Sequence, residues 1–191
     1  MTARLVRALV LVATLLAAAA VMRPSFAADA IEAHDVRLEQ SAGGEGWSLS
    51  ADFTIPLPEP LEEAVRRGVA LYFIVEFELV RPRWYWWDDR AASASQTYRL
   101  SYHALTRQFR VTLNDGFAQV FGSLDEALHV LSRVRGWRVL GPQQVSPGTV
   151  YEALVRMRLD ASMLPKPFQV TAITNRDWNL QTEWTRLRFV P

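Results

Sequence analysis

Apolar and polar side chains alternate with a period of two along several stretches of the chain, which is the pattern of β-strands with one buried face. The clearest example is the stretch 47–55. Residues 69–80 are more apolar, and one of their two faces ends in Glu76 and Glu78, as expected of a central strand whose far end reaches solvent. In all, the pattern predicts about nine strands. They are residues 31–39, 47–55, 69–80, 98–102, 109–113, 117–121, 150–160, 168–174 and 183–190.

Two short helices interrupt the predicted strands. The first covers residues 60–67, with acidic residues in its first turn, arginines in its last turn and Gly68 to end it. The second opens with a capping box at residues 123–126, carries an apolar stripe as far as Val134 and ends at Gly136.

The order of these elements predicts one all-β domain. Many short strands without alternating helices favour a mainly antiparallel β-sandwich over a parallel sheet, and we expect it to be Ig-like in outline with the two helices inserted. Pro165 and Pro167 confine the residues around them to a loop or a sheet edge. No linker or repeat divides the chain, so the predicted domain covers residues 28–191.

The first 27 residues have the pattern of a signal peptide. Arg4 and Arg7 precede an apolar run at residues 8–21, which is shorter than the roughly 20 residues needed to span a bilayer. Small residues at 25 and 27 predict cleavage after Ala27 and a periplasmic location, with no transmembrane span left after cleavage; the alternative is an uncleaved anchor. Cleavage would leave 18 basic against 20 acidic residues, which gives no support to nucleic-acid binding.

A run of four aromatic residues, Trp84, Tyr85, Trp86 and Trp87, is the candidate binding site. Neighbouring side chains on an extended strand point to opposite faces, so these four cannot all enter one core. Exposed Trp and Tyr rings suit a protein partner, a sugar or a membrane interface. The alternative is a structural role, in which the rings cover one corner of the sandwich. The acidic pair after them, Asp88 and Asp89, fits a solvated turn better than a catalytic pair.

The remaining polar residues predict no catalytic site. The chain has no cysteine, and His34, His103 and His129 lie on separate predicted elements without the spacing of a metal site. Signatures of a serine nucleophile or a phosphate-binding loop are also absent from the sequence. We therefore expect a non-enzymatic protein with no metal and no cofactor, and nothing in the sequence indicates a small ligand.

Several segments resemble an exported proteobacterial family of unknown function, the DUF4390 family. The most specific segment runs from Leu164 through Pro-Lys-Pro to Phe168; residues 100–111, 155–169 and 176–180 and the aromatic run add to it. The resemblance covers nearly all of residues 28–191. It implies a periplasmic single-domain protein, sometimes labelled a proline-rich signal-peptide protein, and brings no catalytic residues. It also implies a link to a membrane sensor kinase of the nitrogen-regulation type, beside whose genes such genes lie.

Three functions are compatible with these features. The leading hypothesis is an envelope module that binds another protein, whose identity is unknown. The alternative is a carbohydrate-binding or glycan-processing envelope protein that uses the aromatic run at 84–87. The third is a protein held at the membrane surface by an uncleaved N-terminus together with interfacial Trp side chains.

The signal-peptide interpretation makes the first testable prediction. The exported protein should begin at Ala28, because signal peptidase cleaves after small residues at the positions occupied by Ser25 and Ala27. N-terminal sequencing of the protein from a periplasmic fraction measures this directly. An intact N-terminus in the membrane fraction would instead support the uncleaved anchor.

Overall fold

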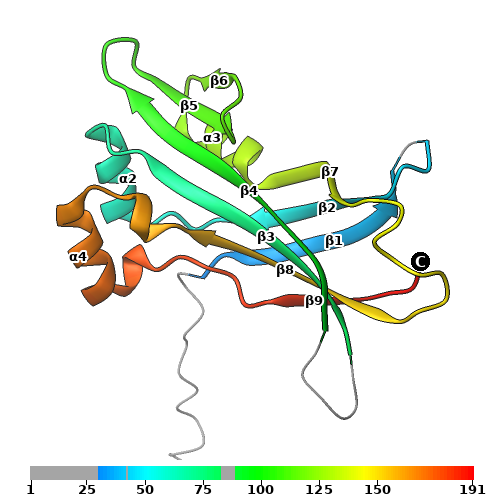
Figure 1. Cartoon of the computed structure of the whole chain (residues 1–191). Helices are drawn as coiled ribbons and strands as arrows, with labels where there is room; N and C mark the ends of the chain where they lie inside the picture. Colours follow the sequence, from blue (N-terminus) through cyan, green and yellow to red (C-terminus); the bar gives the residue numbers. More distant parts are fainter. Residues whose placement is uncertain (1–29, 42, 83–88) are drawn as a thin grey trace, which may run out of the picture.

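The computed structural model describes residues 30–41, 43–82 and 89–191, and they form two antiparallel β-sheets packed face to face (Figure 1). The small sheet has the strand order β1–β2–β7, with β1 at Glu32–Gln40, β2 at Trp47–Thr54 and β7 at Arg133–Leu140. The large sheet has the order β6–β5–β4–β3–β8–β9. Its strands are β3 (Leu71–Arg81), β4 (Asp89–His103), β5 (Gln108–Leu113), β6 (Ala118–Phe121), β8 (Tyr151–Leu159) and β9 (Thr185–Phe189). The prediction of a mainly antiparallel all-β sandwich is confirmed.

The core lies between the two sheets and is centred on β3. Alternate residues of β3 and β8 face it and are fully or almost fully buried. The small sheet closes the core from the other side through Leu49, Ala51 and Phe53 of β2. At the edge of the sandwich the rings of Trp47 and Phe189 meet edge to face with centroids 4.7 Å apart, so β2 and β9 are joined directly.

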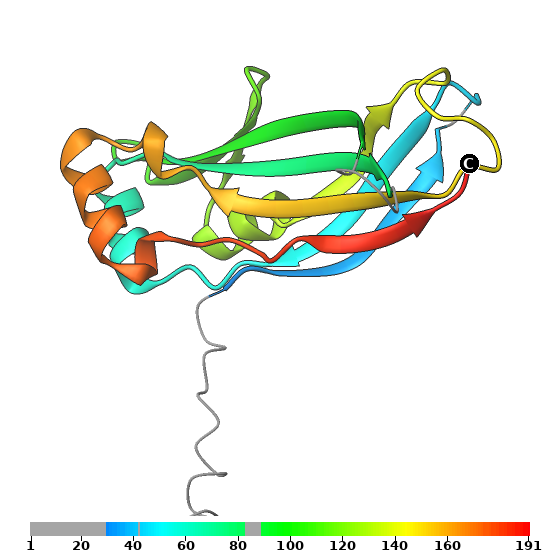
Figure 2. The same ribbon diagram turned by 60° about the horizontal axis from the view of Figure 1, so that its bottom comes forward.

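Helices cover the ends of the sandwich, and two of them match the prediction. Helix α2 (Glu59–Arg66) buries Leu61, Ala64 and Val65, and Gly68 follows it with φ +92°. Helix α3 (Leu124–Leu131) begins as the capping box predicts, with the Glu126 amide donating to the Ser123 hydroxyl. Figure 2 shows α2 and α4 together at one end of the molecule. No helix among the described residues is long and apolar enough to cross a membrane.

The predicted extension of α3 to Gly136 is wrong. The helix ends at Leu131, and Arg133 already pairs with Asp52 as the first residue of β7. Gly136 has φ +57°, and near it the register between β2 and β7 shifts, so apolar residues of β7 do not recur with a period of two. Because of this irregularity, the alternation of apolar and polar residues does not predict β7.

The predicted strand at 168–174 is also wrong, because these residues belong to a third helix, α4 (Lys166–Thr174). Pro165 and Pro167 lie before the helix and in its first turn, where proline is tolerated, so they start a helix and do not mark an edge strand. The ring of Phe168 stacks on Trp178 at 5.3 Å and fixes α4 to the 3₁₀ turn η2 (Arg176–Trp178). A second 3₁₀ turn, η1 (Ala161–Met163), precedes α4.

Strand β4 is longer than predicted and has a neighbour on both sides only over a short central stretch. It pairs with β3 from Asp89 to Leu100 and with β5 from Tyr98 to His103. At Asn114 the chain turns away from β4 with φ +49°. The Asn114 amide donates to the Thr97 carbonyl, and its side-chain oxygen accepts from the Thr97 amide, so Asn114 ends the pairing of β5 with β4.

Two buried tyrosines should titrate differently. Burial raises the pKa of Tyr98 to about 12, and its phenol oxygen accepts a hydrogen bond of 2.7 Å from the buried Gln96 amide. At Tyr151 the Ser146 amide and then Arg81 donate to the phenol oxygen and lower its pKa. An absorbance titration at high pH should therefore show one tyrosine that ionises late and that is lost in a Tyr98→Phe variant.

The shift at Tyr98 also predicts a pH dependence of stability. Between pH 10, the ordinary pKa of tyrosine, and about pH 12, folded Tyr98 keeps a proton that the unfolded chain releases. The free energy of unfolding should therefore fall by about 2–3 kcal/mol across this window, and by less in the Tyr98→Phe variant. Urea unfolding at pH 9 and pH 11.5 measures this fall in the wild type and in the variant. If the free energy of unfolding falls by the same amount in both proteins, Tyr98 is not the group responsible.

Candidate functional site on the outer face of the large sheet

The face of the large sheet that points away from the core carries a group of charged side chains. We call it the outer face. On β3 it presents Tyr72, Ile74, Glu76 and Glu78, each of intermediate exposure, opposite the fully buried positions of the same strand. The neighbouring strands contribute short or charged side chains. These are Ser93, Ser95, Thr97 and Arg99 on β4 and Glu152, Leu154, Arg156 and Arg158 on β8.

Glu76 is the centre of an ion-pair network on the outer face. One carboxylate oxygen accepts hydrogen bonds of 2.8 and 2.6 Å from Arg156, and the other accepts one of 3.1 Å from Arg158. Arg158 also lies 3.6 Å from Asp160, and the guanidinium of Arg156 lies 4.4 Å from the ring centre of Trp184. Both oxygens of Glu76 are engaged by cations, so this carboxylate is arranged to hold β3 to β8 and not to move a proton.

The first half of β4 forms an open edge of the large sheet. We define the open edge as Arg90–Gln96, the part of β4 that lies beyond the pairing with β5. Within it Ser93 and Ser95 are exposed, while Ala92 and Ala94 are half-buried on the side of the core. In Figure 2 β4 is the outermost of the long strands of this sheet. The open edge contains no Pro and no Lys, two of the devices that normally protect a sheet edge.

Two hollows lie along the outer face beside β4. One, of about 300 Å³, borders the open edge and is lined by Glu76, Glu78, Arg90, Ser93 and Ser95. Its shape follows from the short serine side chains, which lie below the longer side chains of β3. The other, of about 630 Å³, lies nearer the end where β5 turns and is lined by both Arg99 and Asp115, so it favours neither charge.

Exposed apolar side chains lie on the β5–β6 hairpin, which turns at Asn114. Phe117, three residues after the turn at Asn114, is fully exposed, and Leu113 and Val120 are exposed by 41% and 48%. Large apolar side chains held in solvent beside an unpaired strand are typical of an interaction surface. The outer face thus carries polar side chains beside a strand with one unpaired edge, and the exposed apolar residues lie on the hairpin that turns at Asn114.

The predicted aromatic site cannot be placed. Trp84, Tyr85, Trp86 and Trp87, with Asp88, lie outside the described residues, in the connection between β3 and β4. The binding role assigned to them stays a prediction, as does the carbohydrate alternative that depends on them. The described strands on both sides show that this connection joins the two strands that carry Glu78 and Arg90.

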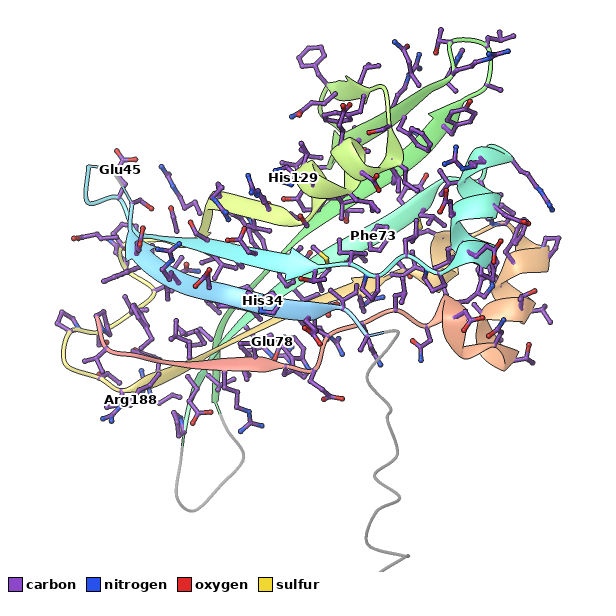
Figure 3. The ribbon with its side chains drawn as sticks, turned by 180° about the vertical axis from the view of Figure 1, so that it is seen from behind. His34, Glu45, Phe73, Glu78, His129 and Arg188 are labelled. Carbon is purple, nitrogen blue, oxygen red and sulfur yellow. The ribbon has the colours of Figure 1, made fainter. Side chains whose placement is uncertain are left out.

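The three histidines do not converge. His34 lies on β1 near Thr54 and His129 lies on α3, well apart in Figure 3. His103 ends β4 and contacts Thr106. Across residues 30–41, 43–82 and 89–191, no group of three His, Cys, Asp or Glu side chains is placed to hold a metal ion. The expectation that the protein is not an enzyme stays a prediction.

The sequence contained signals for part of the outer face. Acidic residues alternate on β3 and arginines alternate on β8, and opposite charges on paired strands attract across a sheet. The sequence did not show that these two strands are neighbours, so the ion pairs between them could not be predicted. The open edge gave no such signal, because Ala and Ser are poor strand formers and residues 91–97 were not predicted as a strand.

The Glu76 network predicts a measurable contribution to stability. A Glu76→Gln substitution removes the charge that balances two half-buried arginines, and we expect a loss of about 1–2 kcal/mol, between the values of exposed and buried pairs. Urea unfolding of the variant measures it. The matched control is Glu62→Gln, which breaks an exposed pair with Arg66 on α2 and should cost at most about 0.5 kcal/mol. If both variants lose the same free energy of unfolding, the Glu76 network contributes no more than an exposed ion pair.

Comparison with known proteins gives one match. No curated protein and no solved structure matches the chain. A family model described as a domain of unknown function (DUF4390) matches residues 28–188, which is most of the chain and includes every described strand except the last residue of β9. The chain therefore belongs to the DUF4390 family.

Proposed function

We propose that this protein is a non-enzymatic interaction module of the bacterial envelope that binds a partner protein at the open edge of β4. The observation that carries the proposal is that Arg90–Gln96 pair with β3 on one side, while no described strand pairs with their other side. The exported location rests on the signal-peptide pattern of residues 1–27.

The open edge lies on a rigid support. β3 pairs with β4 on one side over eleven residue pairs and with β8 on the other side, and its inward side chains are fully buried. A binding surface on such a scaffold is ordered before the partner arrives, which lowers the entropy cost of binding. The exposed Phe117, on the hairpin that turns at Asn114, adds apolar area to this end of the sheet, as interfaces commonly require.

A link to a membrane sensor kinase, which the family resemblance implies, gives one candidate for the partner. The outer face suits it no better than it suits another exported protein, because its charges are mostly paired with one another. The proposal therefore names the surface on this protein that the partner contacts, and not the partner itself.

Site-specific crosslinking tests the proposal. A photoreactive amino acid in place of Ser95 should form a covalent product with a discrete protein in envelope extracts, and excess unmodified protein should suppress it. The matched control carries the same group in place of Gln143, an exposed residue on the loop between β7 and β8. Products of equal yield at both positions, or none at position 95, would refute an interface at the open edge.

A further inference from the structure

We infer that the open edge takes up an extended segment of the partner as an additional β-strand, and that this segment carries a basic side chain that reaches Glu78. This inference rests on the proposed function and specifies how its partner is recognised. Addition of a strand to a sheet edge supplies affinity through backbone hydrogen bonds and specificity through alternate side chains.

The backbone geometry fixes which groups are available. The amide and the carbonyl of Thr97 both point toward β5, since both bond to Asn114. Backbone direction alternates along a strand, so Ser95 and Ser93 direct their amides and carbonyls to the same side. Beyond Asn114 no described strand pairs with that side of β4, although β7 passes close to β4, and no hydrogen bond to these four groups is found among the described residues. An added strand would pair with all four.

The outer face specifies a positive charge on the added strand. Ser93 lies opposite Glu78 in the register of β3 and β4. A residue placed next to Ser93 would be two strand spacings, about 10 Å, from Glu78, a distance that extended Arg and Glu side chains bridge over the short serine. Among the described residues Glu78 is paired with Arg90, at 3.1 Å. The side chain of Glu78 is 24% exposed and that of Arg90 62%, so a second cation can approach the part of the carboxylate that solvent reaches.

The inner side of the open edge specifies small or β-branched apolar residues at the alternate positions. Ala92 and Ala94 face the core side and are half-buried, so apolar side chains beside them would extend the core outward. The turn at Asn114 limits the added strand at one end, and the open edge is seven residues long. The segment is therefore a short extended stretch in which apolar and basic residues alternate.

A synthetic peptide with this pattern tests the inference. The probe is acetyl-Thr-Val-Arg-Val-Arg-Val-Thr-amide with a fluorescent label, and its binding to the protein is followed by fluorescence anisotropy. A Ser95→Pro substitution removes one outward amide without removing a hydrogen bond to β3, and should weaken binding by about tenfold. The matched control, Ser95→Ala, keeps the amide and should change the dissociation constant by less than about twofold.

The charge is tested separately. A Glu78→Gln substitution should weaken binding of the probe by about threefold to tenfold. The Glu152→Gln substitution, on the same face but on β8, should leave binding unchanged. A probe with glutamate in place of arginine should bind weakly to both variants. A probe with alternate N-methylated amides tests strand pairing without any change to the protein, and should not bind.

The results separate the inference from the proposed function. If crosslinking at position 95 succeeds but Ser95→Pro and N-methylation have no effect, the interface exists and strand addition is refuted. If the protein forms dimers in sedimentation equilibrium that Ser95→Pro abolishes, the strand comes from a second copy, and a foreign segment is refuted as the occupant. If the probe binds and responds to every change as stated, the inference holds.

Discussion

The structure depends on the burial of one face of β3. Its inward side chains, Leu71, Phe73, Val75, Phe77 and Leu79, are all completely buried, and each large one contributes about 1.5–3 kcal/mol relative to exposure. β4 and β8 satisfy the two backbone edges of this strand, while the small sheet and α2 add side chains to the same core. Because β3 must be covered in this way, its other face becomes the centre of a broad, flat surface.

That surface is polar for a physical reason. A central strand has no backbone group left for a partner, so its outward side chains are the only groups that can distinguish the outer face. Glu76 and Glu78 are half-buried by their neighbours, and each takes a cation from an adjacent strand. The two pairs differ in use. Glu76 is enclosed by two arginines and stabilises the sheet, whereas Glu78, among the described residues, pairs with Arg90 on the strand that carries the open edge.

Much of this fold was predictable from alternation alone, and the failures have specific causes. Strands with a buried face, such as β2 and β8, were found because burial imposes a period of two. β7 was missed because the residue with positive φ, Gly136, breaks that period, and α4 was taken for a strand because its β-branched residues outweighed the helix-starting role of its prolines. The open edge was missed because its Ala and Ser residues are held in a strand by their pairing with β3, and the sequence does not show this pairing.

The pairing of β3 with β8 has a consequence for how the chain reaches its native state. Phe73 pairs with Leu159, so the most apolar strand waits for a segment more than eighty residues further along. A chain that is synthesised from its N-terminus leaves one edge of this strand without a partner until β8 has followed. Long-range closure of this kind is slow, and during that time the apolar face of β3 is exposed to aggregation.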